Sequence, residues 1–229
     1  MKRVLIWDLP VRFFHWLFAA SFFVAFGIAW LLGDHSPVFP VHMLLGGVMA
    51  FMVLLRIVWG FTGSRWARFE TFEVNPKEAI GYFVGAITGK ARRFAGHNPG
   101  SSLAAYAMFV LLIGLATTGI LMGNGYHGAV EELHELMAWA MVVVVGAHLL
   151  GIILHSIRHR ELLPLSMIDG RKQAEPEVAI PSARPVVALV FLVLTALWTA
   201  GLINGYDSET GRLNLPVVGD VIEVEPEHH

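Results

Sequence analysis

The chain has 229 residues, of which 55% are hydrophobic and only 15% are charged, and its mean hydropathy is +0.61. This composition excludes an ordinary soluble domain, because too few polar residues remain to cover a single buried core. The net charge of −2 gives no indication of a nucleic-acid partner. The sequence contains no cysteine, which excludes disulfides and every metal or cofactor site that needs a thiolate or a thioether link.

Five apolar segments are long enough to cross a bilayer as helices, which takes about 20 residues each. We expect transmembrane helices at residues 11–32, 38–61, 103–123, 132–157 and 184–203. The first segment begins after two basic residues, as a signal peptide does. Its apolar run is too long for one and contains His15 and Trp16, so we expect it to be retained. The sequence therefore predicts an all-α membrane protein.

Basic residues gather in the segments that would lie on one side of the membrane. On that side they are Lys2, Arg3, Arg12, Arg65, Arg68, Lys77, Lys90, Arg92, Arg93, Arg158, Arg160, Arg171, Lys172 and Arg184. The connections 33–37 and 124–131 contain no lysine or arginine, and the tail after Asn204 has only Arg212 among several acidic residues. Because basic loops stay in the cytoplasm, we expect a bacterial inner-membrane protein with a cytoplasmic N-terminus and a periplasmic tail.

The long basic connection between the second and third spans carries a helix start of its own. Asn75 and Pro76 precede Glu78, a pattern that is typical of the first turn of a helix. Apolar residues then recur at helical spacing from Ile80 to Ile87. We expect a short helix that lies in the membrane interface.

Four histidines fall within the predicted spans, where an ionisable side chain is costly and usually functional. His134 and His148 share the fourth helix and are 14 residues apart, or about 21 Å and nearly four whole turns. Their rings therefore point in similar directions at two depths. His42 lies at the outer depth and His15 at the inner one. Two facing pairs result, His42 with His134 and His15 with His148, and each pair could hold a six-coordinate haem iron.

Two arginines and several small residues fit the same arrangement. Arg56 follows His42 by 14 residues and Arg12 lies one turn before His15, so both can pair with a haem propionate at the inner level. Glycine residues would leave room for a flat macrocycle or for close helix contact. They are Gly46, Gly47, Gly114, Gly119 and Gly146. A zinc or transport site stays an alternative, but its ligands would converge on one point.

Other histidines have simpler interpretations. His35, His97, His127 and His159 fall in loops or at boundaries, and we expect them on the surface. His155 lies seven residues after His148 and faces nearly the same way. Its distance from Arg158 matches that of His15 from Arg12, so counting favours His155, but helix ends are poorly placed by sequence and both stay open as the inner ligand.

These residues together resemble one known family. The opening stretch IWDLPVRFFHW from Ile6, His42 with Gly46, RIVWGFTG from Arg56, GHNP from Gly96, and His134-Glu135 followed by His148 carry the likeness. Over residues 7–165 the chain resembles the prokaryotic cytochrome b561 family, which includes the cytochrome b subunits of nickel–iron hydrogenases. The resemblance implies a four-helix core that binds two haem b groups through His15, His42, His134 and His148. It also favours His148 over His155, and implies electron exchange between membrane quinone and a redox partner.

We therefore expect a four-helix di-haem domain at residues 1–165, a cytoplasmic linker at 166–183, and a fifth helix with an acidic periplasmic tail at 184–229. The expected function is electron transfer between the quinone pool and a periplasmic c-type cytochrome or redox enzyme, and no catalytic residue is assigned. Whether the chain has quinone oxidoreductase activity of its own stays open, as does the quinone site, for which His97 and Arg93 are candidates. One alternative is a haem-containing anchor subunit of a hydrogenase-like or dehydrogenase-like complex. Another is a haem-free transporter.

Overall fold

The computed structural model describes residues 2–73, 75–88, 94–216 and 221–223. Within these residues five helices are long and apolar enough to cross a membrane. They are α1 (Leu9–Leu32), α2 (Phe39–Thr62), α4 (Pro99–Gly123), α5 (Ala129–His159) and α7 (Pro185–Gly205). The predictions of an all-α membrane protein and of five spans are confirmed.

Three spans, α1, α4 and α5, begin earlier than their hydropathy predicts, and polar side chains cap the first turns of α1 and α4. Asp8 accepts a hydrogen bond of 3.0 Å from the Val11 amide and starts α1 at Leu9. Asn98 accepts 2.8 Å from the Ser101 amide, and the Ser101 hydroxyl accepts 3.0 Å from the Asn98 amide. This reciprocal capping box satisfies amides that would otherwise be unpaired, so α4 begins at Pro99.

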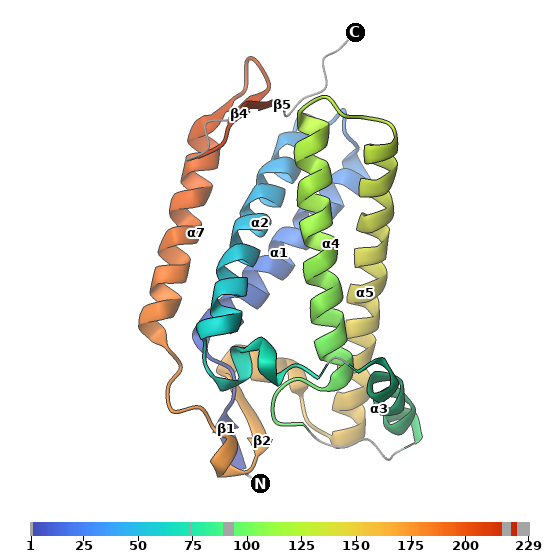
Figure 1. Ribbon diagram of the computed structural model, residues 1–229, viewed down its shortest axis with the longest axis vertical. Helices are drawn as coiled ribbons and strands as arrows, with labels where there is room; N and C mark the ends of the chain where they lie inside the picture. The colour runs from blue at the N-terminus through green and yellow to red at the C-terminus, as the bar shows by residue number, and fades with distance from the viewer. Residues whose placement is uncertain (1, 74, 89–93, 217–220, 224–229) are drawn as a thin grey trace.

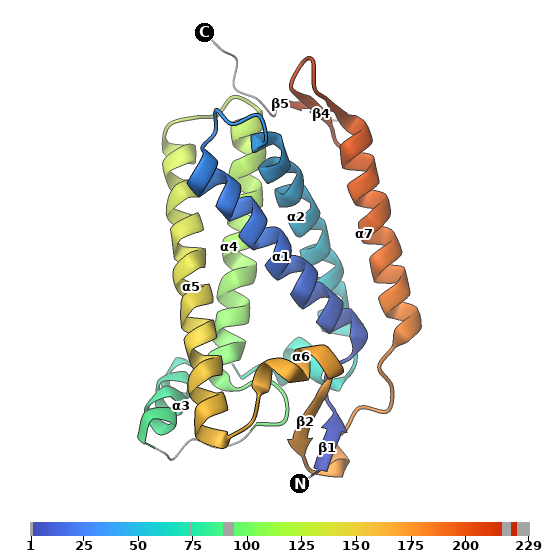
Figure 2. The same cartoon turned by 180° about the vertical axis from the view of Figure 1, so that it is seen from behind.

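Four of the spans form a bundle, and the fifth lies along one side of it. Figures 1 and 2 show α1, α2, α4 and α5 side by side, with α7 beyond α2. Gly47 permits this approach of α7, since a Cβ there would come within 3.2 Å of the Leu202 side chain. Trp198 of α7 also donates a hydrogen bond of 3.1 Å to the Gly47 carbonyl and stacks on Phe51.

The interior of the bundle is apolar, and so is most of its outer face. Met52, Val53, Met141 and Leu202 are almost fully buried between the helices. Large apolar side chains such as those of Phe23, Leu54, Val143 and Val193 are exposed. An exposed apolar surface of this extent fits contact with lipid rather than with water.

Short elements cover the end of the bundle where the chain begins. The predicted interfacial helix is present as α3 (Pro76–Thr88), beside α4 and α5 (Figure 1). Strand β1 (Lys2–Leu5) pairs antiparallel with β2 (Arg171–Ala174), in the register Lys2 with Ala174 and Leu5 with Arg171. The helix α6 (Ser166–Asp169) and four 3₁₀ turns complete this end; the turns are η1 (Arg65–Ala67), η2 (Phe69–Thr71), η3 (Leu163–Leu165) and η4 (Pro176–Val178).

The segment 166–183, expected as a linker, therefore carries α6, β2 and η4. Its Gly170 carbonyl accepts from the amides of Ile6 and Trp7 at 2.8 and 3.0 Å, which ties it to the start of α1. At the opposite end, β3 (Tyr206–Asp207), β4 (Arg212–Asn214) and β5 (Val221–Glu223) form a small antiparallel sheet. The strands β1 and β5 thus lie at opposite ends of the bundle (Figure 1), as an odd number of spans requires.

Candidate functional site

The outer histidines face each other across the bundle. His42 lies on α2 and His134 on α5, and their ring centroids are 6.4 Å apart with an angle of 65° between the planes. A metal bound by both rings needs a metal–nitrogen bond of about 2 Å on each side, which places the ring centres roughly 6 Å apart. The observed separation therefore fits two axial imidazole ligands of one iron.

Hydrogen bonds fix which nitrogen of each outer ring is available. His42 Nδ1 lies 2.8 Å from the Ala25 carbonyl, so Nδ1 carries the hydrogen and donates it. The Thr118 hydroxyl donates to the Gly114 carbonyl at 2.9 Å, so it accepts from His134 Nδ1 at 2.8 Å. Both rings are therefore assigned a free Nε2 lone pair, the arrangement of a metal-ligating histidine whose other nitrogen is held by the protein.

The glycines expected beside a macrocycle have different surroundings. A Cβ at Gly46, one turn after His42, would meet no atom within 4 Å, which leaves space beside the ring, and at Gly119 it would lie 3.8 Å from His134 Cε1. Gly114 instead permits close approach of Met137. Gly146 is exposed and has no neighbour within 4 Å. Gly46 and Gly119 thus adjoin the outer histidines, while Gly114, like Gly47, serves helix packing.

The inner histidines are His15 on α1 and His148 on α5, and they lie close enough to interact electrostatically. His15 Nδ1 is buried, and no hydrogen-bond partner for it exists among the described residues. Its ring packs edge-on against Trp16, with centroids 5.0 Å apart. Since α5 runs as one helix through both His134 and His148, the two levels keep the separation of about 21 Å expected from the sequence.

His155, the competing candidate, makes a different contact. Its side chain is buried, and its Nδ1 lies 2.7 Å from the hydroxyl of Tyr82 on α3. Burial raises the pKa of Tyr82 to about 12, so the hydroxyl keeps its hydrogen at neutral pH. His155 thus fastens α3 to α5.

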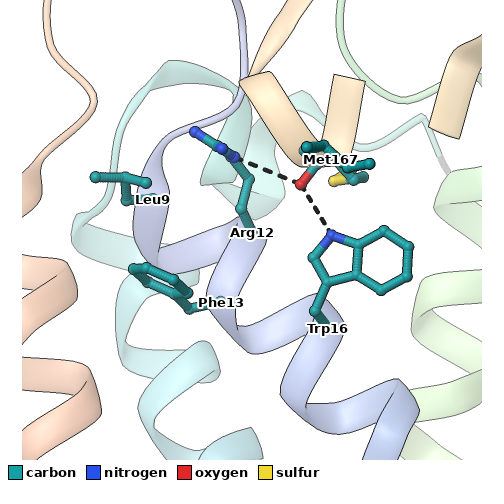
Figure 3. A pocket seen from close by; sticks show the side chains of 6 residues that line it. Leu9, Arg12, Phe13, Trp16 and Met167 are labelled. Carbon is teal, nitrogen blue, oxygen red and sulfur yellow. Dashed lines mark hydrogen bonds between the residues drawn. The ribbon is translucent and has the colours of Figure 1, made fainter. Parts of the chain in front are cut away.

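The two arginines predicted at the inner level have contrasting environments. Arg56 is only 4% exposed. Its guanidinium carbon lies 5.4 Å from the Phe69 ring centre, and its Nη2 donates to the Ala67 carbonyl at 3.0 Å. Arg12 instead donates from Nε to the Met167 carbonyl at 3.5 Å, beside Trp16, whose Nε1 reaches the same oxygen at 3.0 Å. Figure 3 shows these side chains at a pocket of about 300 Å³ between α1 and α6.

Two residues at the inner end were not predicted from the sequence as parts of a site. Asp8 is 1% exposed and accepts hydrogen bonds from Trp59 Nε1 at 3.0 Å and from the Ser64 hydroxyl at 2.5 Å. Lys172 is buried and donates to the carbonyls of Phe94 and Gly96 at 2.9 and 3.1 Å. For Asp8 the sequence offers one indication, its place directly before an apolar run. For Lys172 it offers none.

His35 and His127 are exposed as expected, whereas His97, also expected on the surface, is only partly exposed. The His97 ring packs against Trp7 and Phe72, with centroids 4.7 and 4.1 Å away, and its Nδ1 is buried without a partner in the described chain. Burial lowers the pKa of His97 well below its usual value, and the positive charges of Arg56 and Lys172 lower it further. The side chain of His159 and the whole of Arg93 lie outside the described residues.

Ligands for a bare metal ion do not converge in the same way. Among the described residues, no group of three or more histidine, cysteine, aspartate or glutamate side chains could hold an ion. A closed zinc site needs four ligands at one point, whereas a haem iron needs only two from the protein. The paired histidines therefore suit haem better than zinc.

Comparison with known proteins agrees with this geometry. The prokaryotic cytochrome b561 family matches residues 6–170. Similar proteins named probable Ni/Fe-hydrogenase B-type cytochrome subunit occur in Bradyrhizobium diazoefficiens and Azotobacter vinelandii. The first is 25% identical over 213 residues, covering 74% of this chain and 86% of that protein. The second is 26% identical over 212 residues, covering 73% and 87%. No solved structure gives a significant match. The chain therefore belongs to the prokaryotic cytochrome b561 family and is a multi-pass membrane b-type cytochrome.

Proposed function

We propose that the chain carries two haem b groups and conducts electrons between membrane quinone and a redox partner on the periplasmic side. His42 and His134 would hold the outer haem, and His15 and His148 the inner one. The observation that carries this proposal is the facing pair His42 and His134, with rings 6.4 Å apart and both Nδ1 atoms already hydrogen-bonded. Haem b, when bound, supplies a one-electron couple at its iron.

The chain itself holds the ligand rings at two depths and keeps them away from water. Ala25 and Thr118 fix the orientation of the outer rings. The helix α5 spaces its two ligands by about four turns, so the two sites lie one above the other along the bundle. Buried Met52 and Met141 fill the interior with apolar contacts, which excludes solvent from the bundle core.

We place the N-terminal end of the bundle in the cytoplasm. The distribution of lysine and arginine supports this orientation. These residues lie in the N-terminal segment and in the connections around α3 and α6, while Arg212 is the one basic residue of the tail. A C-terminal alkaline phosphatase fusion should be active, and a C-terminal fluorescent protein should be dark. The reverse result would contradict both the orientation and the five-span topology.

The redox partner follows from two different observations. The acidic tail beyond Asn204 favours a basic partner such as a periplasmic c-type cytochrome, since opposite charge speeds encounter. The names of the relatives favour a second candidate, in which this chain is the haem-containing membrane anchor of a hydrogenase-like or dehydrogenase-like complex. Purification of the tagged chain from its native membrane distinguishes the two, because only the anchor would bring catalytic subunits with it.

Haem stoichiometry tests the central proposal. A pyridine haemochrome assay with protein quantification should give two haem b per chain. A value of one, in protein made with ample haem, would remove one of the two sites from the proposal. A value of zero would favour the haem-free transporter.

A further inference from the structure

Three buried nitrogens lie together at the inner end of the bundle, and none of them has a hydrogen-bond acceptor within the described chain. They are Trp7 Nε1, Arg56 Nη1 and His97 Nδ1. The rings of Trp7 and His97 are 4.7 Å apart, and His97 interacts electrostatically with both Arg56 and His148. Buried polar groups in native proteins are nearly always paired, so three in one cluster indicate a shared acceptor from outside the chain.

The charges of the cluster indicate what that acceptor is. Arg56 is buried among the rings of Phe69, Phe72 and Phe109, and only its Nη2 has a partner, the Ala67 carbonyl. The nearby carboxylate of Asp8 is already engaged by the Val11 amide, Trp59 and Ser64. A buried guanidinium needs an anion to offset its desolvation, and a carboxylate is the acceptor that its geometry fits best.

The protein also holds these donors rigidly in place. Phe72 and Trp7 both pack on His97, with ring centroids 4.1 and 4.7 Å away. Lys172 donates to the carbonyls of Phe94 and Gly96 and so fixes the backbone directly before His97. Donors fixed in this way lose little freedom when an anion binds.

We propose that Arg56 Nη1, His97 Nδ1 and Trp7 Nε1 together bind a propionate carboxylate of the inner haem. The assignment rests on the proposed function, in which His15 and His148 ligate that haem. It adds Trp7 and His97 to the cofactor site. It also separates Arg56 from Arg12, whose Nε contacts the Met167 carbonyl at the α6 pocket instead.

Redox titration of the full-length haem-loaded protein tests the assignment. Arg56→Gln should lower the midpoint potential of the inner haem, because a positive charge beside its propionate is lost. We expect a shift of at least about tenfold in the ratio of reduced to oxidised haem, equivalent to 59 mV for a one-electron couple. Trp7→Phe and His97→Phe should give smaller shifts in the same direction, and Trp7→Phe does so without changing the charge.

The control is Arg65→Gln, which removes the same charge at the same end of the bundle. The Arg65 side chain is exposed, and its guanidinium lies over the Trp66 ring at 4.9 Å. The Arg65→Gln variant should leave the midpoint potentials of both haems unchanged. In resonance Raman spectra, the propionate-bending band of the inner haem should move in the three variants and not in the control. Unchanged potential and unchanged band in Arg56→Gln and Trp7→Phe would overturn the assignment.

A modified haem covers the case in which a variant loses the inner haem altogether. Haem b and its dimethyl ester, which lacks free carboxylates, are titrated into the full-length protein made without haem. The wild type should bind haem b more tightly than the ester at the inner site, and the variants should lose that preference. Equal weakening of both ligands would overturn the assignment alone. A wild type with no inner haem would overturn the proposed function as well.

Discussion

The two histidine levels share α5 but hold their rings in different ways. At the outer level, both Nδ1 atoms are hydrogen-bonded to the protein, to Ala25 and to Thr118. At the inner level, His15 Nδ1 has no partner in the described chain, and the unpaired donors of Trp7, Arg56 and His97 gather nearby. The outer level is thus organised around the orientation of the ligands, and the inner level around positive charge. We infer that orientation controls the outer haem and charge controls the inner one.

Removal of a ligand has the largest expected effect and tests whether the levels are independent. His134→Ala should remove the outer haem alone, and His148→Ala the inner haem alone, so each variant should retain about half of the haem. His155→Ala should retain both, because the proposal assigns the inner haem to His148 and the His155 ring contacts Tyr82 on α3. Haem content and low-temperature spectra measure the outcome. Loss of a haem from the His155 variant, with the His148 variant intact, would reassign the inner ligand.

Removal of an orienting hydrogen bond should affect the outer level only. Thr118→Val deletes the hydroxyl that accepts a hydrogen bond from His134 Nδ1. It should weaken binding of the outer haem by about 10–100-fold, the usual cost of losing such a partner. Haem titration measures the affinity. Thr117→Val is the matched control, since its hydroxyl bonds only the Ile113 carbonyl in the preceding turn. Equal weakening in both variants would show that helix packing, rather than ligand orientation, is responsible.

Removal of a negative charge should affect the inner level only. Asp8→Asn keeps a residue that can cap α1, but removes the carboxylate that partly offsets the charge of Arg56. The midpoint potential of the inner haem should rise, which is the opposite of the effect of Arg56→Gln. The rise should correspond to a few-fold increase in the ratio of reduced to oxidised haem at a given potential. Potentiometric titration resolves the two haems. Equal movement of both would show that the charge acts on the whole bundle and not on one level.

The smallest expected effect concerns Lys172, which supports the loop before His97. Burial lowers the pKa of Lys172 to about 8, although Glu161 acts in the opposite direction. The folded chain therefore binds fewer protons than the unfolded chain between this pH and the ordinary lysine pKa of about 10.4, and stability should rise with pH in that window. The unfolding temperature of the wild type should therefore rise relative to that of Lys172→Met between pH 8 and 10. A constant difference would show that Lys172 does not titrate in this range.

Much of the fold could be predicted because the bilayer imposes length and hydropathy on each span. The helix starts after Asp8 and Asn98 were not predicted, because hydropathy placed the first residues of these spans at 11 and 103, although in both a capping residue precedes a proline. The pairing of β1 with β2 was not readable. The two strands lie near opposite ends of the family domain in the chain, and strands of four residues carry too little alternation to indicate a partner.

The site could be predicted only in part, for a related reason. The helical repeat places His134 and His148 on one face, but it places His155 there almost equally well. In the structure only a contact from another element distinguishes the surroundings of His155, namely Tyr82 of α3, which lies 73 residues away from it in the chain. His97 was missed because its burial depends on the path of a loop, and no local pattern records that path.

The strand pair β1–β2 imposes an order on the biogenesis of the protein. The ribosome releases β1 before any span, but it releases Arg171–Ala174 only after α5. The β1–β2 pair at the inner end therefore cannot form until four spans have been made. Lys172, which fixes the loop before His97, arrives with the same strand. A nascent chain that ends at residue 165 would thus contain all four histidines proposed as ligands while its inner end is still open to an incoming haem.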